Sequence, residues 1–338
     1  MKISAYHKIG GADVFLKTDY DNLESFDKVF ISKVFTDTPI DDKILHLENV
    51  QYGGTGFFYD LAPKLPDEIE HIFPDYHLYD DWVSQQIENG VKPIELKYYT
   101  DYSIGFLTRG CFRQCQFCVN RNYKQVSVHS PLDEFHDLAR PKICLLDDNF
   151  FGLSCWKELL SELHKANKPF QFKQGLDERL LTDEKCQMLF KSRYDGDYIF
   201  AFDNIEDAGL IEKKLQMIRQ HTNKRVKFYV FCGFDRNDVW DYNFWKQDIL
   251  DLMARIEILM KYHALPYIMR FMRYTESPYE RLYNNIARWC NQPAFFTKKN
   301  FHEFAQLREG GIGWRTMLKA ESEITGLTKY FEMKWKEN

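Results

Sequence analysis

The sequence has no long hydrophobic run and no excess of positive charge. None of its apolar stretches approaches the roughly 18 residues that a membrane-spanning helix needs. Residues 1–8 lack the apolar block of a signal peptide. The 45 basic residues are outnumbered by 50 acidic ones, and the net charge of −5 gives no general attraction to nucleic acid or to an anionic membrane. We therefore expect a cytoplasmic protein without membrane contact, for which nucleic acid is not indicated as a partner.

The cysteines lack a second closely spaced group. Five of the eight are scattered singly: Cys144, Cys155, Cys186, Cys232 and Cys290. Single cysteines in a chain without a secretory signal are typical of small buried side chains, which argues against a disulfide framework. Structural zinc modules usually take their ligands from two short knuckles. A zinc site here would need a fourth ligand such as His129 or His136, and this alternative stays open.

Three cysteines do lie together, in a Cys-x3-Cys-x2-Cys run formed by Cys111, Cys115 and Cys118. One short loop thus offers three thiolates, whereas a cubane iron-sulfur cluster usually takes four cysteines. The fourth iron would be left open. An open coordination position is typical of metal centres that bind a substrate or cofactor, because closed sites are usually structural.

This run resembles the radical S-adenosylmethionine (radical SAM) superfamily, and Phe117, the aromatic residue before the last cysteine, also fits that pattern. The resemblance implies a [4Fe-4S] cluster on the three cysteines, with S-adenosylmethionine on the open iron and Phe117 near its adenine. It implies reductive cleavage of S-adenosylmethionine to a 5'-deoxyadenosyl radical, which takes hydrogen from a substrate that the sequence does not identify. An external electron donor such as a flavodoxin or ferredoxin is expected.

From residue 103 the chain alternates short β-rich runs with amphipathic stretches, as a parallel sheet built from strand-helix units requires. We predict strands at 103–108, 143–147, 170–174, 198–203, 225–232 and 266–273. The helices that follow them are predicted at 131–140, 154–167, 182–193, 206–221, 243–263 and 278–291. Six such pairs fit an α/β fold with a partial (βα)6 TIM-like barrel, which the resemblance also implies. We expect this barrel over 99–295 and a C-terminal helical extension over 296–338.

Residues 1–98 form a different pattern, with a helix-like start, β-rich segments at 12–17 and 28–35, and an apolar stretch at 43–47. They indicate a small Rossmann-like α/β region, and they resemble the cobalamin-binding domain that precedes many radical SAM barrels. The departures are large, since the region begins at its helix instead of a strand and has no Asp-x-His-x-x-Gly motif. We interpret it as a remnant that does not bind cobalamin.

Polar residues follow the predicted strands, where strand-helix folds gather their chemistry. Asp147, Asp148 and Asn149 come after the second strand, where the family places groups that receive the cofactor's ammonium, although these residues also favour turns that cap helices. Four other positions could meet the carboxylate or ribose of the cofactor: Gln174, Asp177, Arg179 and Asp203. Gly233 would let the backbone approach adenine, and Arg270 and Tyr274 are the candidates for contact with substrate.

Two alternative functions stay open. Four basic residues crowd the cysteine loop: Arg109, Arg113, Arg121 and Lys124. They would offset the negative charge of a cluster, or they would serve a non-catalytic zinc- or cluster-stabilised module that binds RNA. The second alternative is an RNA- or peptide-modifying enzyme of the methylthiotransferase type, which would need an auxiliary cluster that the scattered cysteines do not supply.

Overall fold

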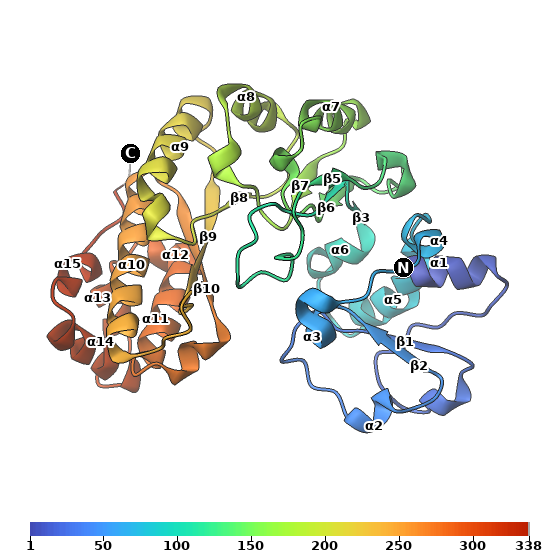
Figure 1. The fold of residues 1–338 in the computed structure, drawn as a ribbon, viewed down its shortest axis with the longest axis horizontal. Coiled ribbons are helices and arrows are strands. Elements are labelled where there is room, and N and C mark those ends of the chain that lie inside the picture. Colours follow the sequence, from blue (N-terminus) through green and yellow to red (C-terminus); the bar gives the residue numbers. More distant parts are fainter. Residues whose placement is uncertain (337–338) are drawn as a thin grey trace. The chain divides into compact units, whose positions relative to one another are not determined.

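The computed structural model describes residues 1–336 and shows a mixed α/β protein with several parallel sheets (Figure 1). The chain divides into two compact units, Met1–Phe170 and Gln171–Asn338. This boundary falls inside strand β7 (Phe170–Phe172), so the N-terminal 98 residues share a unit with the first predicted strand-helix pairs. Within residues 1–336, no helix combines the length and the apolar character needed to cross a bilayer.

The first unit opens with helix α1 (Lys2–Ile9) and a two-stranded parallel sheet of β1 (Val29–Ser32) and β2 (Val50–Gly53). The predicted helical start and the strand at 28–35 are thus confirmed. The strand predicted at 12–17 is wrong, because that segment is mostly exposed and adopts neither helix nor strand. A β-rich segment becomes a strand only when a neighbour accepts its backbone hydrogen bonds. The apolar stretch at 43–47 lies mainly in helix α2 (Asp42–Leu45).

Short helices connect this small sheet to the next one. They are α3 (Thr55–Phe58), α4 (Asp67–Glu70), α5 (Asp80–Glu88) and α6 (Lys97–Thr100). A three-stranded sheet follows in the order β3-β6-β7, with β3 (Tyr102–Gly105) parallel to β6 (Lys142–Leu145). Tyr102 is opposite Lys142, and the buried faces of both strands place their apolar residues in the core.

The helix predicted at 131–140 is wrong, and only a 3-10 turn, η5 (Leu132–Glu134), forms there. The side chain of Phe135 is fully buried directly over Gly105, where an added Cβ would come within 2.3 Å of its ring. The chain bends to insert this ring, and Pro141 disfavours a helical conformation at the preceding residue. Tertiary packing therefore overrides the local helical pattern.

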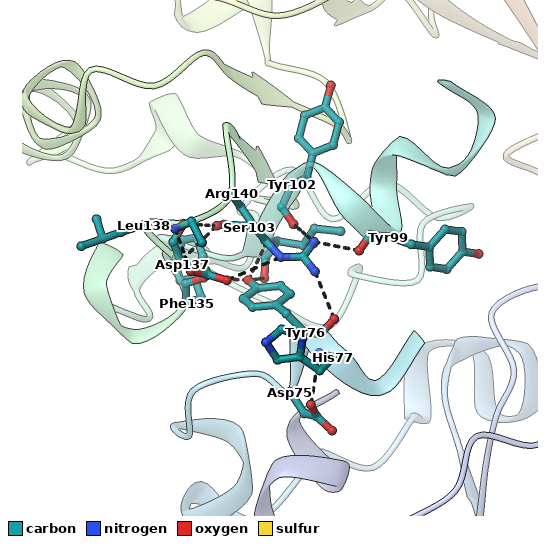
Figure 2. Close-up of polar contacts among 12 residues, drawn as sticks. Asp75, Tyr76, His77, Tyr99, Tyr102, Ser103, Phe135, Asp137, Leu138 and Arg140 are labelled. Atoms are coloured by element: carbon teal, nitrogen blue, oxygen red, sulfur yellow. Dashed lines mark hydrogen bonds and ion pairs between the residues drawn. The ribbon is translucent and has the colours of Figure 1, made fainter. Parts of the chain in front are cut away.

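A buried arginine holds the bent segment against the elements before it, as Figure 2 shows. The Arg140 guanidinium donates to the carbonyl oxygens of Tyr99, Tyr102 and Tyr76 at 2.8, 3.0 and 3.0 Å. It also lies 4.3 Å from the centre of the Tyr76 ring, whose hydroxyl donates to Phe135 O at 2.6 Å. This junction ties the N-terminal segments to strand β3, so the two form one packed structure.

The second unit contains a parallel sheet in the order β10-β9-β8. Its strands are β8 (Tyr198–Ala201), β9 (Val226–Cys232) and β10 (Leu265–Arg270). Strand β9 is central, and its residues alternate strictly between buried and half-buried, as a sheet covered on one face requires. Leu176, in the segment after β7, forms a parallel bridge with Phe200 of β8.

Five of the six predicted helices are confirmed within a few residues. They are α7 (Trp156–Ala166) in the first unit and α8 (Asp183–Lys191), α9 (Ala208–His221), α10 (Tyr242–Lys261) and α11 (Glu280–Cys290) in the second. Thr182 caps α8, because its side chain accepts from Lys185 N. Helix α7 begins after Cys155, whose side chain makes no capping hydrogen bond.

The C-terminal extension is helical, as predicted. It contains α12 (Pro293–Phe296), α13 (Phe301–Gln306), α14 (Ile312–Glu323) and α15 (Leu327–Phe331). A capping box formed by Asn300 and Glu303 starts α13.

All six predicted strands are present at their expected places, and the residues described arrange them as two three-stranded sheets.

Candidate metal centre

The three closely spaced cysteines lie on a loop that is closed at its base by two short antiparallel strands, β4 (Thr108–Arg109) and β5 (Ser127–Val128). Gly110 begins the loop with a φ of +93°, and an added Cβ there would lie 2.4 Å from Gln125 O. Only glycine combines that φ with such a close approach of two backbone segments. The loop ends are therefore fixed before any metal is considered.

The exposure of the residues in this loop alternates along the chain. Cys111, Cys115 and Phe117 are half-buried, whereas the intervening Phe112, Gln114 and Gln116 are exposed. Gln114 has a φ of +51°, which reverses the chain direction between the first two cysteines.

Backbone N–H groups donate to the sulfurs at the two ends of the run. Arg113 N lies 3.4 Å from Cys111 Sγ, and Asn120 N lies 3.4 Å from Cys118 Sγ. Such N–H···S bonds stabilise negative charge on sulfur, and in iron-sulfur proteins they help to set the reduction potential. The same two donors would support these sulfurs if they bound a metal.

Asp147, which follows β6, holds the start of the cysteine loop. Its buried carboxylate accepts from Thr108 N and Thr108 Oγ1, both at 2.7 Å, and from Leu107 N at 3.2 Å. Burial raises the pKa of Asp147 to about 7, while the three donors act in the opposite direction. The structure therefore engages Asp147 with the chain itself at the base of the loop.

Asp148 joins the two sides of the loop. Its Oδ2 accepts from Gly110 N and its Oδ1 from Asn120 Nδ2, both at 2.7 Å. Because Gly110 precedes Cys111 and Asn120 follows Cys118, one carboxylate fixes both ends of the cysteine run. The neighbouring Asn149 is buried, and its Nδ2 lies 3.4 Å from Cys111 Sγ. The second-strand residues predicted to meet the cofactor thus lie at the cysteine loop, where they order it.

The N-terminal region also contacts the cysteine loop. The Tyr59 hydroxyl donates to Phe117 O, and the nearby Cys118 contributes, after burial, to raising the pKa of Tyr59. Asp60 Oδ2 accepts from Arg121 Nε at 2.6 Å and from Asn122 Nδ2 at 3.0 Å. Arg121 in turn lowers the pKa of Asp60. Tyr59 and Asp60 are separated from these partners by about sixty positions, so no local sequence motif predicts the contacts.

Replacing Asp60 with alanine is expected to loosen the far side of the loop without unfolding the chain. The change removes both side-chain contacts at a half-buried position, so we expect a loss of metal affinity at or below the roughly 10-fold lower limit for outer-shell partners. Release of iron from reconstituted protein to a chelator measures this. Asp67→Ala, at the exposed start of α4, is the matched control and should release iron at the wild-type rate. Equal release from both variants would contradict a bracing role.

Other residues near the loop are engaged elsewhere. His129, one suggested zinc ligand, has Nε2 3.2 Å from Glu70 Oε1 and Nδ1 2.8 Å from Ser130 Oγ. His136, the other, is half-buried, and burial lowers its pKa. Among the basic side chains, Arg109 stacks on Phe106 at 4.0 Å, and Arg121 pairs with Asp60.

The donor set of the loop fits a cluster bound through three thiolates. Across residues 1–336, no three His, Cys, Asp or Glu side chains converge on a point where they could hold a single metal ion. A cubane takes each thiolate on a different iron, so its ligands surround the cluster and do not meet at one atom. Three half-buried cysteines on one loop, two of them with a backbone donor at the sulfur, supply the three-thiolate donor set that such a cluster would take.

The remaining cofactor candidates belong to the second unit. Gln174 is exposed. Arg179 donates to Asp177 Oδ1 at 2.8 Å and to Asp207 Oδ2 at 3.2 Å, so its guanidinium is already paired with carboxylates. Phe231 N donates to Asp203 Oδ1 at 3.2 Å, which links β8 to β9.

Gly233 and the substrate candidates lie after β9 and β10. Gly233 has a φ of +76°, and its N–H donates to Asp248 Oδ2 at 2.9 Å. An added Cβ there would lie 3.3 Å from Tyr274 Cβ, so the glycine permits close packing within the chain. Arg270 contacts Asn284 and stacks on the Tyr274 ring at 4.6 Å.

Glu178 is a buried acid that the sequence reasoning passed over. Only 1% of it is exposed, and its Oε2 accepts from Ala201 N at 3.2 Å. Within the described part of the chain its Oε1 has no hydrogen-bond donor, and Arg179 Nε lies 3.8 Å from it. Burial, reinforced by Asp177, raises the pKa of Glu178 to about 8. The only feature of the sequence that could have indicated Glu178 is its position between two candidate residues, Asp177 and Arg179.

The raised pKa predicts how a Glu178→Gln variant differs from wild type. Between the ordinary pKa of 4.5 and about 8, the folded state binds a proton that the unfolded state has released. Wild-type stability should therefore fall as pH rises through this window, by about 1 kcal/mol per pH unit, and the variant lacks this term. Urea unfolding of both proteins from pH 5 to 8.5 measures the difference, which should grow with pH and then level off. Parallel profiles would refute the assignment.

Comparison with known proteins gives no match for this chain among protein-family models, curated proteins or solved structures.

Proposed function

We propose that this protein is a radical SAM enzyme whose [4Fe-4S] cluster is held by Cys111, Cys115 and Cys118. The observation that carries the proposal is the cysteine loop itself, with three half-buried thiolates on one short connection after β4. Backbone donors support two of the sulfurs, and Asp148 fixes both ends of the run. An ordinary surface loop would have no need for this set of constraints.

The residues of the chain would divide the work as follows. The three cysteines would bind three irons and leave the fourth open. Asp147 and Asp148 would keep the loop in its ligating shape, and Asn149 would tune Cys111 through its amide. When bound, the cluster and S-adenosylmethionine supply a strong one-electron reduction that cleaves the sulfonium and yields 5'-deoxyadenosine after hydrogen transfer.

The finer fold is part of the same proposal. The six predicted strands occur in the predicted chain order, in two three-stranded sheets, and this order supports the proposed partial (βα)6 barrel of the radical SAM type. Cofactor contacts by Gln174, Asp177, Arg179, Asp203 and Gly233 stay predictions of the resemblance. A reducing compartment such as the cytoplasm suits the chemistry, because thiols persist there.

Anaerobic reconstitution with iron and sulfide tests the proposal. We expect a brown protein that binds about four irons and that forms 5'-deoxyadenosine from S-adenosylmethionine when a strong reductant is added. Omission of the reductant is the control and should give no product. A colourless protein that retains zinc and leaves S-adenosylmethionine intact would refute the proposal and support a structural zinc module.

A further inference from the structure

The second unit contains a hollow of about 440 Å³, and none of the candidate cofactor or substrate residues lines it. It is lined by residues that directly precede two strands: Lys224 and Arg225 before β9, and His263 before β10. The candidates Gly233 and Arg270 lie at the opposite, carboxyl ends of these strands. Chemistry in strand-helix folds gathers at the carboxyl ends, so a ligand at the amino ends would occupy a distinct site.

Arg219 forms a positively charged wall of this hollow. Among the described residues, its guanidinium donates only to backbone carbonyl oxygens, those of Tyr262 at 2.8 Å, His263 at 2.9 Å, Lys224 at 3.0 Å and Thr222 at 3.3 Å. These bonds tie the segments before β9 and β10 together. Carbonyl groups satisfy the donors but do not cancel the charge, and burial lowers the pKa of Arg219 without removing its proton. The wall therefore keeps a positive potential.

Two further cations, Lys224 and Arg225, line the same hollow. Among the described residues, Lys224 Nζ has hydrogen bonds of 3.5 Å to Phe190 O and to the Tyr198 hydroxyl, and it lies 5.7 Å from the centre of the Tyr198 ring. Arg225 pairs with Asp197 Oδ1 at 2.5 Å, but Asp197 also forms an ion pair with Lys227 at 2.8 Å, so one carboxylate is shared by two cations. The Arg225 side chain is 62% exposed, so its remaining N–H groups can reach a ligand. The site is thus built for an anion.

Other residues that line the hollow are apolar or aromatic. Trp335 is half-buried, and its position is set by edge-on contacts with His263 at 5.3 Å and Phe296 at 5.6 Å between ring centres. Leu265 and Pro293 add apolar surface. A flat ring can pack on an indole, while lysine and arginine bind a phosphate. The volume lies within the range of pockets that enclose small ligands.

We propose that this hollow binds a mononucleotide, with Lys224 and Arg225 on the phosphate and Trp335 against the base. The proposal does not depend on iron-sulfur chemistry, since every residue in it belongs to the second unit. The charge and the indole act at different parts of the ligand. Each can therefore be tested with a fragment that carries only one of the two groups.

Calorimetric titration of the full chain with AMP, adenosine and inorganic phosphate tests the assignment. AMP should bind, whereas adenosine and phosphate should each bind at least about tenfold more weakly. The double change Lys224→Ala with Arg225→Ala should weaken AMP binding by at least about tenfold, because two charge-assisted contacts are lost. Trp335→Phe should weaken AMP binding without changing phosphate binding. Lys213→Ala, an exposed lysine elsewhere on α9, is the matched control and should bind AMP like wild type.

Three outcomes would overturn the proposal. They are no AMP binding at about 1 mM, undiminished binding in the double variant, and phosphate binding as tight as AMP binding. Thermal melting of every variant shows whether it is folded, and both substituted cations, Lys224 and Arg225, lie at exposed positions.

Discussion

The Cys115→Ala variant is expected to lose its iron-sulfur cluster and all cleavage of S-adenosylmethionine while it stays folded. Cys115 is the middle ligand of the run, so its loss should lower cluster affinity by more than the roughly 100-fold that an outer-shell change costs. The side chain is half-buried on a loop whose ends are fixed by Asp148, and that support is independent of its sulfur. Iron content, the visible absorption of the cluster and 5'-deoxyadenosine formation measure the effect, and circular dichroism reports the fold.

The matched control is Cys155→Ala. Cys155 is also half-buried but stands before α7, outside the cysteine run, so this variant should load iron and cleave S-adenosylmethionine like wild type. A structural zinc site would behave differently, because metal binding and folding would be coupled and Cys115→Ala would unfold. A folded Cys115→Ala protein with full activity would refute the assigned ligand set.

The sequence located the cysteine loop because its signal is local. Three thiolate donors within eight positions specify a ligand set whatever surrounds them. The same was true of most helices and strands, where hydrophobic period and capping residues act over a few turns. Helix α10, for example, formed over the long amphipathic stretch predicted at 243–263. Local patterns were sufficient wherever tertiary contacts agreed with them.

Prediction failed where distant residues decided the conformation. Residues 131–140 have a helical pattern, yet the pocket above Gly105 takes the Phe135 ring and bends the chain. The support of the cysteine loop by Tyr59 and Asp60 is another case, since both come from the N-terminal region. No spacing rule connects residues so far apart. Such contacts emerge only when the chain is folded.

The roles of the residues after β6 were only partly foreseen. Their polarity and position indicated a site, and carboxylates there were expected either to meet the cofactor or to shape a turn. In the structure Asp147 and Asp148 accept hydrogen bonds from the cysteine loop. A sequence shows that a carboxylate is present, but the donors it meets depend on how β6 aligns with β3. The register of β6 against β3, and not the composition of the segment, therefore decides the role of each carboxylate.

The Asp148→Ala variant tests that role most directly. The change removes the bonds to Gly110 N and Asn120 Nδ2 together, so the two ends of the cysteine run lose their common anchor. We expect cluster affinity to fall by about 10- to 100-fold, the usual cost of losing an outer-shell partner. The three thiolates stay in place, so excess iron and sulfide should restore part of the loading. Competition with a chelator at graded iron concentrations measures this shift.

Asp133→Ala is the control for this experiment, because Asp133 is an exposed acid of the same unit. Its iron affinity should equal that of wild type. Asp148→Asn adds a finer test, since the amide oxygen can keep one of the two bonds while the amide nitrogen cannot accept the other. Its affinity should lie between those of wild type and Asp148→Ala. Wild-type affinity in Asp148→Ala would mean that the cysteine loop holds its shape without this carboxylate, and the mechanism of loop support would have to be assigned to Asp147 and the β4–β5 strands.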